Sequence, residues 1–169
     1  AFLDKHPEWK GRVVLMLVTV PSRENVASYR ALKKRIDELV GQVNGKHSTM
    51  DWTPVDYYYR SLPFDRLVSL YAASDVMLVT PLRDGMNLVC KEYLACHDGD
   101  GGVLVLSEMA GASYELHEAL CVNPFDRAGI ARAMQEALTM PPDEQRKRNA
   151  PMQQRLARYT SKKWAREFL

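Results

Sequence analysis

Cysteine, long apolar runs and net charge are all scarce in this sequence of 169 residues. The three cysteines, Cys90, Cys96 and Cys121, are odd in number and form no CxxC pair, which predicts reduced thiols in a cytoplasmic protein. We expect each of them to be a small buried side chain. No apolar run reaches the ~18 residues of a membrane span, and a net charge of +2 is too small for a nucleic-acid footprint. We therefore expect neither a membrane nor a nucleic acid as partner.

Two ligand signatures are also missing. No GxGxxG motif follows an apolar run, because Gly99, Gly101 and Gly102 precede one instead, and this argues against a dinucleotide-binding domain. The four histidines have no paired ligand spacing, so the sequence predicts no metal site and no cofactor. These histidines are His6, His47, His97 and His117.

The sequence does contain a regular alternation of apolar runs and amphipathic stretches. Runs rich in β-branched residues predict strands at residues 12–20, 55–59, 75–80, 103–107 and 120–122. Apolar residues at helical spacing predict helices at residues 25–43, 64–73, 87–97, 126–139, 142–159 and 161–169, with a helix end at 1–9 and a polar loop at 45–52. The alternation favours an α/β fold. We expect one Rossmann-like, three-layer domain over residues 1–169, with a mainly parallel sheet and a helical C-terminus.

The strongest motif follows the third predicted strand, where residues 80–92 are TPLRDGMNLVCKE. Ligands of open parallel sheets bind beyond the carboxyl ends of the strands. Gly85 permits a tight bend and a close approach of a ligand to the backbone. The helix that begins near Met86 or Asn87 has unpaired first amides and a positive dipole end, and both suit a diphosphate.

Two acids lie on either side of this anion site. Asp84 precedes the helix, within reach of a sugar hydroxyl, and Glu92 lies one turn inside it. The rise from Leu88 to Glu92 is about 6 Å, at ~1.5 Å per residue, which is similar to the step from a phosphate to its ribose. The alternative is a plain strand–turn–helix joint, in which Asp84 caps the helix and Glu92 lies on a solvated face. The residues alone leave both interpretations open.

The motif resembles that of the retaining GT-B glycosyltransferases, and within them the trehalose-6-phosphate synthases. Members carry Arg-Asp-Gly-Met-Asn-Leu-Val followed by Glu, as residues 83–89 and Glu92 do here. The resemblance implies the C-terminal, nucleotide-sugar-binding half of a GT-B fold, and it spans residues 7–169. Further blocks similar to the family's are residues 21–23, 44–46, 52–54, 74–76, 106–107, 110–112 and 122–124, with Trp164 near the end.

The resemblance implies a role for each motif residue. Asp84, the one residue assigned to catalysis, would hold hydroxyls of the donor glucose and would not act as a general acid. Glu92 would bind the ribose. Arg23 would bind the phosphate of glucose 6-phosphate, a task that suits the planar guanidinium. The remaining implied contacts are to the glucose from Gly85, Met86 and Asn87, to the diphosphate from Leu88 and Val89, and to the uracil from Leu62.

The reaction implied by the resemblance is transfer of glucose from UDP-glucose to glucose 6-phosphate with retention, giving trehalose 6-phosphate and UDP. The protein's part would be positioning and charge stabilisation, while the leaving phosphate helps to deprotonate the acceptor. Two alternatives stay open. One is a glucosylglycerol-phosphate synthase with another phosphorylated acceptor, and the other is a non-catalytic regulatory domain that binds a nucleotide sugar.

The chain also departs from the family's pattern. In family members an Arg and a Lys, in a strand–helix unit ahead of the present Ala1, neutralise the leaving diphosphate. The N-terminal domain, which supplies most of the acceptor site, is missing too. We therefore expect a fragment that binds donor weakly and is inactive alone. Its expected partners are UDP-glucose, glucose 6-phosphate and its own missing N-terminal domain, and a homo-oligomer is left open.

Overall fold

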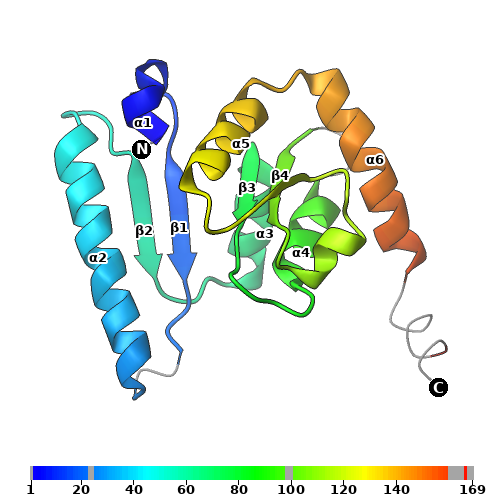
Figure 1. Cartoon of the computed structure of the whole chain (residues 1–169), viewed down its shortest axis with the longest axis horizontal. Coiled ribbons are helices and arrows are strands. Elements are labelled where there is room, and N and C mark those ends of the chain that lie inside the picture. Colours follow the sequence, from blue (N-terminus) through cyan, green and yellow to red (C-terminus); the bar gives the residue numbers. More distant parts are fainter. Residues whose placement is uncertain (1, 23–24, 98–100, 160–165, 167–169) are drawn as a thin grey trace. The chain divides into compact units, whose positions relative to one another are not determined.

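The structure is a computed structural model that describes residues 2–22, 25–97, 101–159 and 166 (Figure 1). The chain divides into two compact units, residues 1–63 and residues 64–169. Both units contain parallel strands with helices packed against them, so the predicted α/β class is confirmed. The helix predicted at residues 161–169 falls outside the described residues, except for Arg166.

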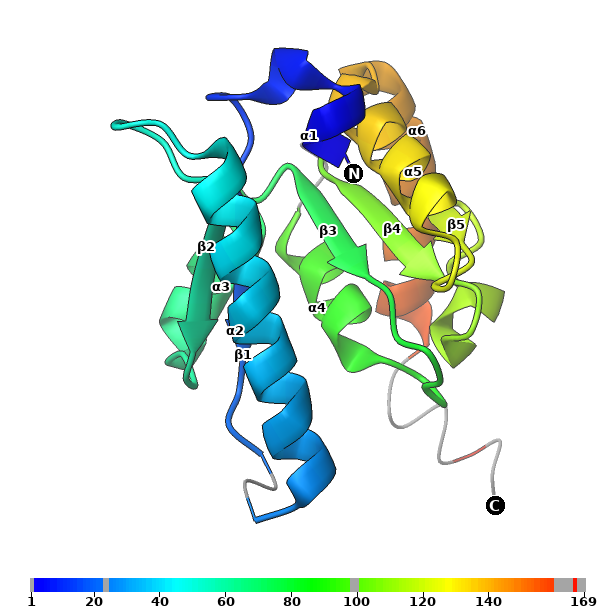
Figure 2. The same ribbon diagram turned by 60° about the vertical axis from the view of Figure 1, so that its left-hand side comes forward.

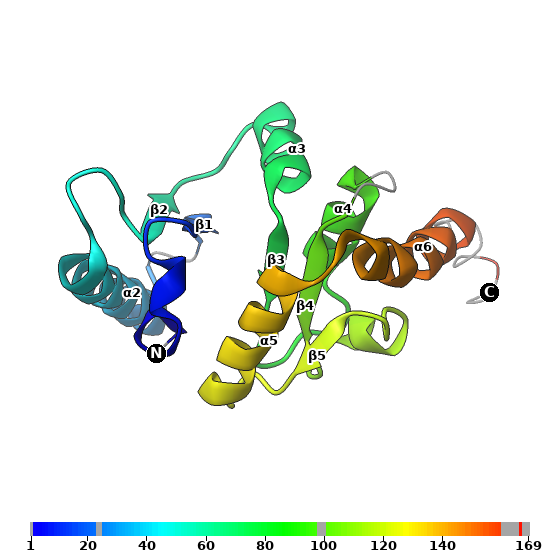
Figure 3. The ribbon, with the colours of Figure 1, turned by 90° about the horizontal axis from the view of Figure 1, so that it is seen from above.

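The first unit is built on two parallel strands. Leu15 lies opposite Val55 and Thr19 lies opposite Tyr59, and the long helix packs against the second strand (Figure 3). The unit contains α1 (Phe2–Lys5), the 3-10 helix η1 (Pro7–Trp9), β1 (Leu15–Thr19), α2 (Ala27–His47) and β2 (Val55–Tyr59).

Helix α2 ends later than the sequence predicts, because its last turn is bonded to β2. The side-chain amide of Asn44 donates to the carbonyl of Val55 (2.9 Å) and accepts from the Val55 amide (3.1 Å). Trp52 Nε1 donates to the carbonyl of Val13 (3.1 Å), which ties the connection after α2 to the chain before β1. The predicted loop at 45–52 therefore begins only at Ser48, where α2 is capped.

The almost continuous apolar run at residues 12–20 is typical of a buried parallel strand, and the structure differs from that prediction in two respects. The first residues of the predicted strand still belong to a turn, because the amides of Arg12 and Val13 donate to the carbonyl of Trp9 (3.1 and 3.2 Å). Leu15 and Met16 of β1 are 39% and 42% exposed. Among the described residues β1 belongs to a two-stranded sheet with one long helix, and such a unit cannot cover both faces of a strand.

The second unit is a three-layer arrangement around the parallel sheet β3-β4-β5. Helix α5 packs against one face of the sheet, and α4 packs against the other, with α3 and α6 against α4 (Figures 2 and 3). The elements are α3 (Phe64–Ala73), β3 (Val76–Val79), α4 (Leu88–Cys96), β4 (Val103–Ser107), the 3-10 helix η2 (Gly111–Tyr114), β5 (Leu120–Val122), α5 (Arg127–Thr139) and α6 (Pro142–Arg158).

Strand β4 is buried along its whole length, and its side chains contribute to the hydrophobic core on both faces of the sheet. Val105 packs in the cluster that contains Ala133 and Ala137 of α5. Leu104 packs in the cluster that contains Tyr93 of α4. Successive side chains of a strand point to opposite faces, so an unbroken apolar run is what a central strand of a three-layer domain requires.

The cysteine prediction holds for one residue of the three. Cys90 is fully buried, and its thiol donates to the carbonyl of Asn87 (3.1 Å). Burial raises the pKa of Cys90 to about 11, so it stays a neutral thiol. Cys96 is half-buried and Cys121 is exposed, so the expectation of a buried side chain was wrong for Cys121. Its strand, β5, borders the sheet and shows alternating burial.

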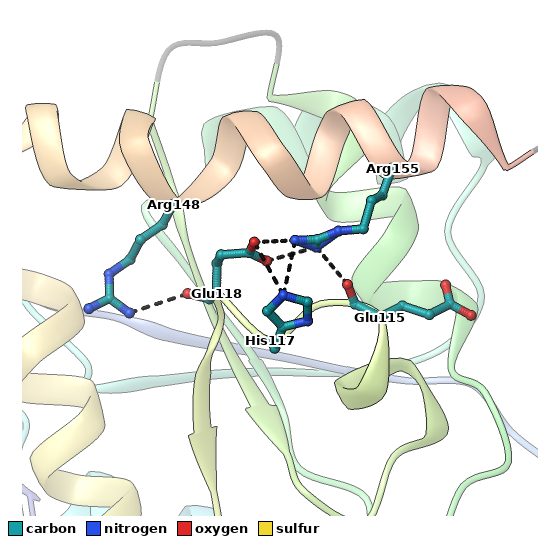
Figure 4. A network of polar contacts seen from close by, with 5 residues as sticks. All are labelled: Glu115, His117, Glu118, Arg148 and Arg155. Carbon is teal, nitrogen blue, oxygen red and sulfur yellow. Dashed lines mark hydrogen bonds and ion pairs between the residues drawn. The ribbon is translucent and has the colours of Figure 1, made fainter.

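A polar network joins α6 to the connection between β4 and β5 (Figure 4). Arg155 pairs with both carboxylate oxygens of Glu118, one of them at 2.8 Å, and donates to the carbonyl of Glu115 (2.7 Å). Arg148 donates to the carbonyl of Glu118 (3.2 Å). Partial burial opposes the charge on Glu118, but the hydrogen bonds from Arg155 outweigh it and lower the pKa of Glu118. The network therefore anchors the segment that follows η2.

Candidate functional site

The carboxylate of Asp84 is fixed by its own turn. The Met86 amide donates to Asp84 Oδ1 (3.0 Å), and Asn87 Nδ2 donates to Asp84 Oδ2 (3.0 Å). The hydrogen bond from the Met86 amide, together with that from Asn87, lowers the pKa of Asp84. The side chain is therefore an anion at neutral pH. A carboxylate has about four acceptor positions, so two remain for the hydroxyls of a ligand.

Asn87 is the residue that turns the chain into α4. Its φ of 76° is the left-handed conformation, which asparagine tolerates better than most residues, and its Oδ1 accepts from the Cys90 amide (3.0 Å). The helix cap is therefore Asn87, and the alternative in which Asp84 caps the helix is wrong. Gly85 has no positive φ, and no atom lies within 4 Å of the position of a Cβ built on it. Glycine at position 85 thus leaves open space beside the backbone.

The start of α4 is exposed and able to bind an anion. The first amides of an α-helix have no acceptor within the helix, and the dipole adds a partial positive charge there. Helix α4 begins at Leu88, one residue later than predicted, and Leu88 and Val89 are 60% and 38% exposed. A phosphate or diphosphate could therefore reach these amides.

Glu92 lies one turn into α4, on its exposed side, and has a partner that the sequence did not suggest. The hydroxyl of Tyr71, a buried residue of α3, donates to Glu92 Oε2 (3.2 Å). Burial, and then the charge of Glu92, raises the pKa of Tyr71 to about 12, so the phenol keeps its proton and remains a donor. Tyr71 therefore orients Glu92 while leaving its second oxygen for a ligand.

We expect Tyr71→Phe to weaken binding of UDP to the full-length protein by about 0.5–1.5 kcal/mol, the net contribution of one hydrogen bond. The ring still fills its buried position, so the melting temperature should change little. Isothermal titration with UDP measures the effect. The matched control is Tyr114→Phe, since Tyr114 is exposed, and an equal loss in both variants would contradict the role of Tyr71.

The loop after β4 is bonded to the turn that carries Asp84. The amide of Asp84 donates to the carbonyl of Met109 (3.2 Å), and the amide of Gly111 donates back to the carbonyl of Asp84 (2.9 Å). The amide of Ala112 donates to the carbonyl of Met86 (2.9 Å). Two loops at the carboxyl edge of the sheet thus form a single unit. In the sequence, residues 110–112 belong to a block similar to the family's, but the residues alone do not show that this block is bonded to the turn of Asp84.

Ser107 joins the ends of β3 and β4. Its hydroxyl is fully buried, donates to the carbonyl of Pro81 (2.8 Å) and accepts from the Met109 amide (3.0 Å). This places the chain after β3 beside the chain after β4. Ser107 belongs to a block similar to the family's, but its place at the end of a predicted strand does not reveal these two hydrogen bonds.

The structure brings most of the predicted site residues onto one turn and its helix. These are Asp84, Gly85, Met86, Asn87, Leu88, Val89 and Glu92. Leu62 belongs to the other compact unit, so its predicted contact with uracil stays a prediction. Arg23, predicted to bind an acceptor phosphate, lies outside the described residues, and its role also stays a prediction.

Five of the predicted site residues on this turn and helix are exposed, namely Gly85, Met86, Leu88, Val89 and Glu92. A hollow of about 370 Å³ lies beside β5 and α5, and its lining residues, which include Cys121, Asn123 and Arg132, contain no member of the motif. Within the described ranges, no cluster of three or more His, Cys, Asp or Glu residues could hold a metal ion. The helices of these same ranges include none long and apolar enough to cross a membrane.

Comparison with known proteins gives close relatives over almost the whole chain. The "Bifunctional trehalose-6-phosphate synthase/phosphatase" of Thermoproteus tenax is 50% identical over 168 residues, which are 99% of this chain and 23% of the relative. The "Alpha,alpha-trehalose-phosphate synthase [UDP-forming]" of Candida albicans is 45% identical over 168 residues, 99% of this chain and 35% of the relative. The chain therefore spans about a quarter to a third of the length of these relatives.

Solved structures of trehalose-phosphate synthases superpose closely on this chain. An E. coli structure described as bound with UDP-2-fluoro glucose superposes with a TM-score of 0.96 at 40% identity, covering 99% of this chain and 37% of that one. A UDP-forming alpha,alpha-trehalose-phosphate synthase from Burkholderia xenovorans, in complex with glucose-6-phosphate, has a TM-score of 0.96 at 36% identity, with the same coverage. The family model for glycosyltransferase family 20 matches residues 1–169. The chain therefore belongs to glycosyltransferase family 20.

Proposed function

We propose that this chain is the donor-binding part of a retaining glucosyltransferase, which moves glucose from UDP-glucose to glucose 6-phosphate and forms trehalose 6-phosphate. The observation that carries the proposal is the arrangement of Asp84, the exposed start of α4 and Glu92 along one turn and its helix. Asp84 accepts hydrogen bonds from hydroxyls of the glucose, and Glu92 accepts hydrogen bonds from hydroxyls of the ribose. The amides of Leu88 and Val89 bind the diphosphate between them.

The charges of this arrangement suit an anionic sugar nucleotide. The positive end of α4 attracts the diphosphate. The two carboxylates lie on either side of it, where neutral hydroxyls are their partners, and hydrogen bonds to charged groups are worth about 1.5–3 kcal/mol each. The relative bound with UDP-2-fluoro glucose and the relative in complex with glucose-6-phosphate support these two substrates.

In the proposed reaction Asp84 binds and orients the donor and does not transfer a proton. Its pKa is lowered by the Met86 amide and by Asn87, so it is a poor proton donor at neutral pH. The leaving phosphate helps to deprotonate the acceptor oxygen on the same face of the sugar, which retains the configuration. The protein's part is to hold both substrates in line and to stabilise the developing charge.

The exposed residues of the motif hold a donor from one side only, and a buried site needs a second surface. We propose that this second surface is the N-terminal domain of a longer protein, and that residues 1–169 alone bind donor weakly and transfer no glucose. Arg23 would contact the acceptor phosphate and Leu62 the uracil. We propose no cofactor and no metal ion.

Titration of UDP against the full-length protein and its Glu92→Ala variant tests the donor site. We expect Glu92→Ala to weaken UDP binding by about 1.5–3 kcal/mol, roughly 10- to 150-fold, because the ribose loses a charge-assisted hydrogen bond. Glu136→Ala, an exposed acid of α5 outside the motif, is the matched control. An unchanged dissociation constant for Glu92→Ala would remove Glu92 from the site. Assay of the full-length protein with UDP-glucose and several phosphorylated acceptors then tests the acceptor.

A further inference from the structure

Gly111 lies closer to the turn of the site than any residue with a side chain could. A Cβ built on Gly111 would lie 2.1 Å from the carbonyl oxygen of Gly85 and 2.8 Å from its carbonyl carbon. Both are backbone atoms, so they cannot move aside as the end of a flexible side chain can. The φ of Gly111 is not positive, so the need for glycine here arises from close approach and not from backbone conformation.

The close approach allows the hydrogen bonds between the two loops to form. The Gly111 amide donates to the carbonyl of Asp84, and the neighbouring Ala112 amide donates to the carbonyl of Met86, both at 2.9 Å. The flanking alanines, Ala110 and Ala112, are buried in the core that contains Tyr93 and Leu104. The loop after β4 is thus anchored to the core on one side and to the turn on the other.

We propose that Gly111 is a positioning residue: the absence of its Cβ lets the loop after β4 hold the residue 84–86 turn, and with it the carboxylate of Asp84, in place for the donor sugar. This inference rests on the proposed function, because it assigns the turn to the glucose. Helix α4, which carries Leu88, Val89 and Glu92, packs against the core through Tyr93 and Leu94. A shift of the turn should therefore disturb the glucose contacts more than the contacts to the rest of UDP.

The test compares Gly111→Ala with the wild type in the full-length protein. We expect kcat/KM for UDP-glucose to fall by about 10- to 100-fold, equivalent to the loss of one charge-assisted hydrogen bond, while the dissociation constant of UDP stays within about threefold. Amide hydrogen exchange without ligand should become faster across residues 84–87. Gly41→Ala is the matched control, because a Cβ at Gly41 meets no atom within 4 Å.

A second variant keeps the inference testable if Gly111→Ala folds poorly. Ser107→Ala removes the hydroxyl that joins Pro81 to Met109 without adding bulk, and we expect the same pattern with a smaller loss, about 3- to 10-fold in kcat/KM. Equal losses for UDP and UDP-glucose, or unchanged exchange at residues 84–87, would overturn the positioning role. If the wild type binds neither ligand, the proposed function fails instead, and the exchange measurement still decides whether Gly111 holds the turn.

Discussion

Asp84→Asn should lower kcat/KM for UDP-glucose by about 100- to 1000-fold in the full-length protein, the largest loss that we expect from one substitution. The amide has one acceptor oxygen in place of two and carries no charge, so two charge-assisted hydrogen bonds to the glucose weaken, each worth about 1.5–3 kcal/mol. In the wild type Asn87 Nδ2 donates to Asp84 Oδ2. In the variant the new NH₂ group would face this donor, and two donors cannot form a hydrogen bond with each other. Asn87 cannot turn its oxygen towards the new NH₂ group without giving up the cap on the Cys90 amide.

Steady-state kinetics with UDP-glucose, together with titration of UDP, measures the effect of Asp84→Asn. The UDP affinity should change far less than kcat/KM, because UDP lacks the glucose that Asp84 holds. Asp65→Asn, in the exposed first turn of α3, is the matched control. A loss smaller than tenfold would show that Asp84 does not contact the sugar.

Arg155→Ala should lower the free energy of unfolding by about 1.5–3 kcal/mol, the range for hydrogen bonds to a charged group, and this is the largest stability effect that we expect from a charged residue of the chain. The substitution removes both contacts to the Glu118 carboxylate and the hydrogen bond to the carbonyl of Glu115 (Figure 4). Glu118 is then left partly buried and without its main partner, which is the costly way to break an ion pair. Chemical denaturation of wild type and variant measures the difference.

The loss in Arg155→Ala should depend on pH in a defined direction. The pKa of Glu118 is lowered in the folded state, so the pair stabilises the protein above the pKa of an unfolded glutamate, ~4.3. The stabilisation is lost as the pH falls through the lower, folded pKa. The difference in stability between wild type and variant should therefore narrow as the pH falls through the folded pKa of Glu118, to what the hydrogen bond to the Glu115 carbonyl contributes. The control is Arg146→Ala, whose partner Asp143 is almost fully exposed, and a loss there as large as at Arg155 would contradict the network.

Much of the fold follows from local patterns. The predicted strands at residues 55–59, 103–107 and 120–122 and the helix at 64–73 agree with the structure at both ends. The structure adds that β4 is buried along its whole length. One boundary that shifted, the end of α2, lies where the side chain of Asn44 pairs with Val55 of the next strand.

The motif of the candidate site was also readable in the sequence, because its members are close neighbours along the chain. A carboxylate, a turn, a helix start and a second carboxylate lie within residues 84–92, and local geometry alone places them in order. Local geometry did not reveal that Asn87, and not Gly85, takes the positive φ. Both residues favour turns, so residue type alone does not decide between them.

The residues that support the site were decided by the tertiary structure. Tyr71, Ser107 and Gly111 are 21, 26 and 27 residues along the chain from Glu92, Pro81 and Asp84, to which they donate. The buried side chain of Asn149 likewise donates to the carbonyls of Gly101 and Gly102, across 48 and 47 residues. The sequence by itself determined the class of fold, the family resemblance and the acids of the motif, because these depend on spacing along the chain. Which residues hold those acids in place was decided only when the parallel strands brought distant loops to one edge of the sheet, since contacts of that kind leave no periodic trace in a single sequence.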